Sequence, residues 1–166
     1  MEATLPFWKL AKKDIQTVKL LLENSRKLNI DVNATIHIGI NGFMLASKEG
    51  HKNVVKLFLE FAGKLNIDLN AKNGAGGTAF INACAWGRTD VVKLFLDYSG
   101  PIKIDLNAWD YAGQTAFDIA SRFGETEVVN LLQKYRQGRS IHRFFNLRFL
   151  LSSLIRGLGF FFWWLH

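Results

Sequence analysis

Residues 76–100 read GGTAFINACAWGRTDVVKLFLDYSG, and residues 112–136 repeat the pattern as AGQTAFDIASRFGETEVVNLLQKYR. The same kinds of residue recur throughout the chain at an offset of 37. The triplets in step are Asp31, Asp68 and Asp105; Asn33, Asn70 and Asn107; Gly39, Gly76 and Gly113; Phe43, Phe80 and Phe117; Ala46, Ala83 and Ala120; and Gly50, Gly87 and Gly124. A fixed period of this length is typical of repeat proteins, in which each unit buries its apolar face only against its neighbours.

Each unit contains the signals of two short helices. A glycine such as Gly76 suits a turn that needs positive φ, and Gly87 stands where a first helix would end. The run VVKLFL at residues 91–96 then provides the apolar stripe of a second helix, with Lys93 on its solvated side. The pattern therefore predicts a helix-turn-helix unit that is joined to the next unit by a turn.

These residues resemble ankyrin repeats, whose signature runs T-P-L-H-x-A, then Gly, then a Val-Val and Leu-Leu stripe. Thr78-Ala79-Phe80 and Thr115-Ala116-Phe117 stand at the signature tripeptide, and the likeness covers about residues 5 to 136. The resemblance implies an all-α, ankyrin-type solenoid of helix-turn-helix repeats with hairpin fingers, to which we add a C-terminal hydrophobic helix. The boundaries that we expect are 1–30 for a partial N-terminal capping repeat, 31–67 and 68–104 for full repeats, 105–136 for a C-terminal capping repeat and 137–166 for a tail.

Two departures from the family pattern lead to structural expectations. Asn41-Gly42 stands where Thr-Ala is usual, so we expect the first helix of that repeat to start less firmly. The period of 37 exceeds the usual 33, which predicts a longer second helix or a longer loop. Pro101 favours the loop in its own copy. The last second helix carries Gln133 where the earlier units have Leu59 and Leu96, and Lys134 follows, as a terminal cap facing water requires.

The positive charge is concentrated at the end of the chain. Residues 1–134 hold 16 basic against 14 acidic residues, whereas residues 135–166 hold five arginines and no acid. The repeat surface is therefore nearly neutral, and we expect no nucleic-acid partner. One cysteine excludes an internal disulfide, and the N-terminus lacks a signal-peptide pattern. We therefore expect a cytoplasmic protein, with membrane association through the C-terminus as an open alternative.

No constellation of catalytic or metal-binding residues is present in the sequence. Residues 74–77, GAGG, lack the Lys-Ser/Thr of a phosphate-binding loop, and the repeat explains these glycines. Cys84 falls at a small core position, and the four histidines share no metal-ligand spacing. The acids Asp31, Asp68 and Asp105 suit turns between units. We therefore expect a protein that is not an enzyme and that uses no cofactor and no metal.

The resemblance implies a binding surface for a partner protein. In ankyrin-like stacks the turn tips and the exposed face of the first helices form a concave groove that holds the partner. Aromatic residues and arginine dominate binding energy at such interfaces. We therefore expect a scaffold or adaptor whose contact residues are His37, Ile38, Lys48, Trp86, Trp109, Tyr111, Gln114, Arg122 and Phe123.

The tail RFLLSSLIRGLGFFFWWLH, residues 148–166, holds twelve large apolar side chains. A helix over residues 149–165 would be about 25 Å long against a hydrocarbon core of about 30 Å, and Arg156 near its centre opposes insertion. Membrane contact, packing on the repeats or a partner, and no specific role all remain open. The alternative function is therefore a membrane-attached regulator, in which the tail is an anchor or an interfacial helix. Its membrane-contact residues are Phe149, Leu150, Leu154, Phe160, Phe161, Phe162, Trp163 and Trp164.

Overall fold

The computed structural model describes residues 15–36 and 38–138. The chain divides into two compact units, with the boundary after Val129. The first unit contains six helices in the described ranges, and residues 126–138 form a further helix that continues into the second unit. The six helices are α2 (Ile15–Asn24), α3 (Gly42–Glu49), α4 (Lys52–Leu65), α5 (Ala79–Ala85), α6 (Thr89–Asp97) and α7 (Ala116–Phe123). The fold is all-α, as the repeat pattern predicted.

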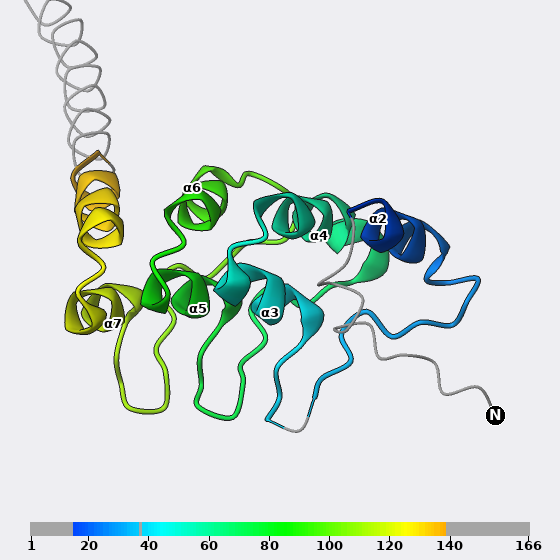
Figure 1. Cartoon of the computed structure of the whole chain (residues 1–166), viewed down its shortest axis with the longest axis horizontal. Coiled ribbons are helices and arrows are strands. Elements are labelled where there is room, and N and C mark those ends of the chain that lie inside the picture. The colour runs from blue at the N-terminus through cyan, green and yellow to red at the C-terminus, as the bar shows by residue number, and fades with distance from the viewer. Residues whose placement is uncertain (1–14, 37, 139–166) are drawn as a thin grey trace, which may run out of the picture. The chain divides into compact units, whose positions relative to one another are not determined.

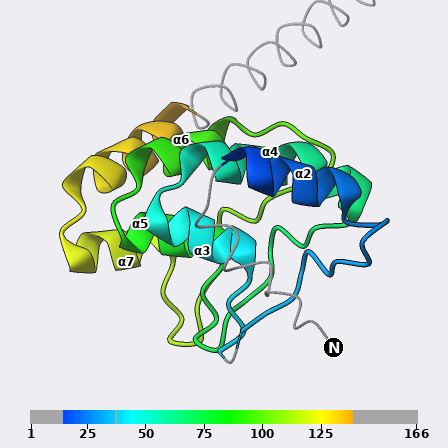
Figure 2. The ribbon, with the colours of Figure 1, turned by 45° about the vertical axis from the view of Figure 1, so that its right-hand side comes forward.

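Within the first unit the helices form two rows. Figure 1 shows α2, α4 and α6 in one row and α3, α5 and α7 in the other, with long hairpins projecting from the second row. Neighbours within each row pack on one another, α3 packs on α4, and α5 packs on α6. The view in Figure 2 shows the same two rows from another side. In the described residues the hairpins contain isolated bridges, from Thr35 to Asn41 and from Trp109 to Thr115, and no β-strand.

The first helix of each unit starts with a capping side chain. Thr78 accepts a hydrogen bond from the Ile81 N–H on α5, and Thr115 does the same for Asp118 on α7. Asn41 accepts from the Met44 N–H at 2.9 Å and is buried. Asparagine caps helices as well as threonine does. The weaker start expected for this helix was therefore wrong, because the residue that breaks the family pattern is itself a good cap.

Glycine ends α3 and α7 at the expected places, whereas α5 has Trp86 as its C-cap and Gly87 next. Gly50 adopts φ +81°, and its N–H closes α3 by donating to the carbonyls of Ala46 and Ser47. This left-handed conformation is accessible to glycine at little cost, so the chain can reverse immediately into α4.

Phenylalanine rings pack in the core, both within units and, through Phe43 and Phe95, between them. Phe43 lies 5.5 Å from Phe58 and 5.6 Å from Phe95, and Phe95 lies 5.8 Å from Phe80, measured between ring centroids. The last two pairs are edge-to-face, a geometry that adds about 0.5–1.5 kcal/mol per pair beyond burial. The VVKLFL stripes supply Phe58 and Phe95, so the stripe that the sequence predicted to be buried does join one repeat to the next.

The additional residues in the period take two forms. Helix α4 extends over 14 residues, whereas α6 ends after nine and is followed by a loop that contains Pro101. A Cβ atom built on Gly63 would lie 2.9 Å from Pro101 Cγ, so the long helix has a glycine where the loop crosses it. Both predicted alternatives, the extended helix and the loop, are thus confirmed in different repeats.

Asparagine side chains join the turns of successive repeats. Asn33 donates from Nδ2 to the Asn66 carbonyl at 3.0 Å and accepts at Oδ1 from the Asp68 N–H at 3.0 Å. Asn70 repeats both bonds with Lys103 and Asp105, at 2.9 and 2.8 Å. The structural role expected for the repeated aspartates is confirmed by bonds to the backbone N–H two residues later, at 2.9–3.0 Å. These are Asp31 to Asn33, Asp68 to Asn70, and Asp105 to Asn107.

Candidate partner-binding surface

The hairpins and the first-helix row present a continuous side of the first unit, opposite the α2, α4, α6 row (Figures 1 and 2). We call this side the inner face. It consists of the hairpin turn around Ile38, the turns at 73–77 and 110–114, and the C-terminal ends of α3, α5 and α7. Most of the partner-contact residues expected from the sequence fall here.

Side-chain acceptors stiffen two of the hairpins. Asn73 Oδ1 accepts from the N–H groups of Ala75 and Gly77, each at 2.9 Å. Asp110 Oδ1 accepts in the same way from Ala112 and Gln114, at 2.9 and 2.8 Å. Ile36 stands at the corresponding position of the preceding hairpin, one period before Asn73, and offers no such acceptor. The last two tips therefore have side-chain hydrogen bonds that Ile36 cannot provide.

Neighbouring hairpin tips are hydrogen-bonded to one another. The Gly74 N–H donates to the Ile38 carbonyl at 2.9 Å, and the Tyr111 N–H donates to the Ala75 carbonyl at 3.0 Å. Together with the bonds to Asn73, these contacts engage every N–H of the GAGG turn. The turn has no free N–H groups for a phosphate, which supports the structural interpretation of its glycines.

Trp86 is an exposed aromatic residue of the inner face, at the end of α5. It is the C-cap of α5 and is 52% exposed, with Lys48 Nζ 4.6 Å from the centroid of its ring. Arg88 Nε donates to the Lys48 carbonyl at 2.8 Å and ties the end of α3 to the next repeat. The cation holds the indole in place while leaving much of its surface free.

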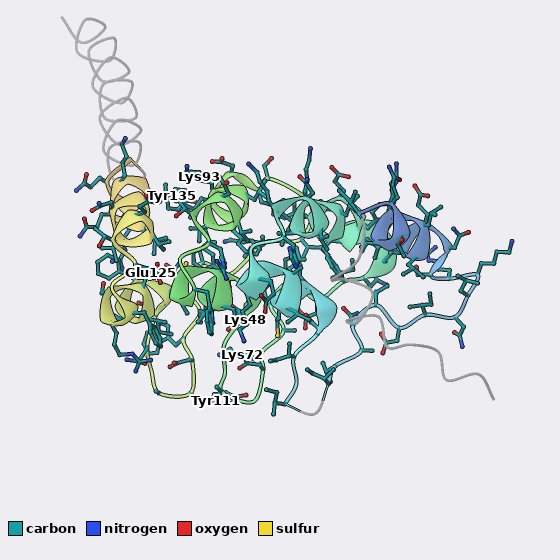
Figure 3. The ribbon with its side chains drawn as sticks, viewed as in Figure 1. Lys48, Lys72, Lys93, Tyr111, Glu125 and Tyr135 are labelled. Atoms are coloured by element: carbon teal, nitrogen blue, oxygen red, sulfur yellow. The ribbon has the colours of Figure 1, made fainter. Side chains whose placement is uncertain are left out.

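A second aromatic group lies on the last hairpin. Tyr111, 71% exposed, occupies the tip, and Trp109 is exposed on the approach to it. Lys72 Nζ donates to the Trp109 carbonyl at 2.8 Å and lies 5.8 Å from the Tyr111 ring centroid. Figure 3 shows Lys72 and Tyr111 together at the hairpins, on the side away from Lys93.

The remaining expected contacts lie around α7 and the first described hairpin. Phe123 is 59% exposed, with the Arg122 guanidinium 5.1 Å from its ring. Gln114 is half-buried at the base of its hairpin, and Ile38 is exposed at a tip. His37 lies outside the described residues.

Lys72 is a candidate residue of this surface that the sequence reasoning missed. It stands one period before Trp109, at the same position of the hairpin, and this equivalence was the available signal. What distinguishes Lys72 is a hydrogen bond and a cation–ring contact that both reach the next repeat. A lysine without these two contacts would be an ordinary solvated side chain.

The described ranges bear on two candidate kinds of chemistry, a reactive cysteine and a metal site. Cys84 is fully buried on α5, and burial raises the pKa of its thiol well above the ordinary value, so the reactive thiolate is scarce. Residues 15–36 and 38–138 contain no cluster of three or more His, Cys, Asp or Glu side chains that would hold a metal ion. The predicted membrane-contact residues, from Phe149 to Trp164, lie outside the part that is described. Within that part no helix combines the length and apolarity that a membrane crossing requires.

Paired helices stacked in two rows, with a hairpin between successive pairs, define a helical repeat protein. The chain belongs to the ankyrin-repeat family: the family model for ankyrin repeats, in three copies, matches residues 7–97 and 43–143. No curated protein matches the chain. Ankyrin repeats are in general modules for protein–protein interaction, and proteins built from them are typically non-enzymatic scaffolds.

Proposed function

We propose that the chain is a scaffold that binds a partner protein through the inner face, without a catalytic step. The observation that carries the proposal is a set of three exposed aromatic rings on one side of the first unit, each with a cation over it. Trp86, Tyr111 and Phe123 come from two successive repeats and meet Lys48, Lys72 and Arg122 respectively. Exposed apolar side chains that gather on one face indicate an interaction site, whereas single scattered ones do not, and aromatic residues dominate binding energy at interfaces.

Rigidity is the physical mechanism of the proposed binding. The hairpin turns are closed by side-chain acceptors and joined tip to tip, and the aromatic side chains rest against cations. Little conformational entropy remains to be lost when a partner docks, so more of the contact energy contributes to affinity. Truncating a hot-spot residue of this type to alanine weakens the free energy of binding by about 2 kcal/mol or more.

Truncating the two helix-end aromatics tests the proposal. We expect the double variant Trp86→Ala/Phe123→Ala of the full chain to retain its fold by circular dichroism and to lose partners that the unchanged chain captures from cell extract. The matched control is Leu20→Ala/Leu28→Ala, which removes apolar side chains of similar exposure, 58% and 56%, from outside the inner face. Equal capture by the inner-face variant and the unchanged chain would refute the proposal.

A further inference from the structure

Three positively charged side chains of the inner face remain accessible to a partner. The ammonium and guanidinium groups of Lys48, Lys72 and Arg122 lie over exposed rings, at 4.6, 5.8 and 5.1 Å from the centroids. A ring face holds a cation in position without neutralising it, so the positive charge stays at the surface. Figure 3 shows Lys48 and Lys72 on the hairpin side of the molecule.

The carboxylates of the same region are less available. Asp110 accepts two backbone hydrogen bonds within its hairpin, and Asp118 accepts from the N–H and the hydroxyl of Thr115 in the cap of α7. Glu125 is half-buried against Gly87, whereas Glu49 is exposed at the end of α3. The surface around the aromatics of α5 and α7 therefore presents positive groups to a partner.

Two apolar anchors occupy equivalent positions in successive repeats. Trp86 and Phe123 are one period apart, and their helices α5 and α7 pack side by side. Neighbouring helices lie about 8–10 Å apart, so the backbone positions that carry the two rings are about that far apart. A chain in the polyproline II conformation advances about 9 Å in three residues and returns to the same side. One side chain at i and another at i+3 would then meet the two rings. Glu49, at the equivalent position one repeat earlier, ends the apolar row.

We infer that the occupant of this site is an extended acidic segment of a partner protein, carrying two large apolar side chains three residues apart. The inference rests on the proposed function. The carboxylates of the bound segment would face Lys48 and Arg122, and its apolar side chains would contact Trp86 and Phe123. Charge complementarity of this kind directs the choice of partner more than it raises affinity.

The test is selection of binders from a library of random twelve-residue peptides, displayed to the full chain. Because the arginine-rich tail also attracts acids, binders retained by Trp86→Ala/Phe123→Ala are removed by counter-selection. We expect the remaining peptides to be rich in Asp and Glu and to carry large apolar residues at i and i+3. Their affinity should fall about tenfold or more for each single variant, Trp86→Ala and Phe123→Ala, because each ring is expected to meet its own anchor.

Charge reversal supplies the matched control. Lys48→Glu/Arg122→Glu should weaken the same peptides by about tenfold or more, whereas Lys56→Glu/Lys93→Glu, with an equal change in net charge on α4 and α6, should leave affinity within about twofold. Selected peptides that need both rings but are neutral or basic, or that carry other anchor spacings, would overturn this inference and leave the proposed function intact. If counter-selection leaves no binders, the inference also fails.

Discussion

The asparagine bridge between repeats offers a quantitative test of what holds the stack together. Replacing Asn70 with alanine removes the Nδ2 bond to the Lys103 carbonyl and the Oδ1 bond from the Asp105 N–H, at 2.9 and 2.8 Å. A typical hydrogen bond contributes about 0.5–1.5 kcal/mol net. Both bonds of Asn70 are exposed and therefore fall in the lower part of this range, so we expect the free energy of unfolding to decrease by about 1–2 kcal/mol. For a chain of this length that corresponds to a fall in Tm of about 2–8 °C.

The chain contains its own control for this substitution. Asn107 occupies the same turn position and keeps the same local bond from its N–H to the aspartate two residues before, but its side chain has no hydrogen-bond partner in the described residues. Asn107→Ala should therefore change the free energy of unfolding by less than about 0.5 kcal/mol, as at most surface positions. Asn33→Ala should resemble Asn70→Ala, because it loses the equivalent pair of bonds.

The assay is urea unfolding of the three variants followed by circular dichroism, with thermal scans as a second measure. Stability in a repeat protein is approximately a sum of terms within units and between neighbours, so the Asn70 effect reports one interface between units. An Asn107→Ala variant as destabilised as Asn70→Ala would refute the reasoning, since the loss would then come from the preference of asparagine for turns.

Three further outcomes follow from the structure. Gly76→Ala should destabilise more than Gly113→Ala in urea: both need positive φ, which costs about 1–2 kcal/mol, but only a Cβ at Gly76 would meet Tyr111, 2.5 Å from its N. Cys84 should react with iodoacetamide only as the chain unfolds, because burial raises the pKa of its thiol, and rapid labelling of the folded chain would contradict this expectation. The contribution of the buried neutral thiol to stability is complete below about pH 8.5 and declines at higher pH, where the unfolded chain loses the proton first. If residues 148–166 contact a membrane, a reporter-tagged full chain will locate to membranes and a chain ending at Gly138 will not; identical distributions would count against membrane contact.

Much of the fold follows from local sequence signals. The caps Thr78 and Thr115, the helix-ending Gly50 and the apolar stripes act within a few residues of themselves, so their pattern was sufficient to predict two helices per unit. Asn41 was misjudged because it was compared with the family pattern and not with the physical requirement for a cap.

The candidate site was predictable in part. The sequence placed Trp86, Tyr111 and Phe123 on the exposed side of the first helices and turns, and all three are exposed there. It did not indicate that Lys48 and Lys72 lie over these rings, because each pair joins residues 38 or 39 positions apart in neighbouring repeats. Which partner contacts these residues make remains a prediction.

The amino-acid sequence by itself determined the period, the positions of turns and helices, and the need for stacking, because each depends on local backbone preference and on the spacing of apolar residues. Only the tertiary structure decided how the units are joined. The asparagine bridges, the contact of Phe43 with Phe95, and the cations Lys48 and Lys72 over Trp86 and Tyr111 all join residues of different repeats. Their geometry depends on the distance between stacked units, a quantity that the sequence of a single repeat does not contain.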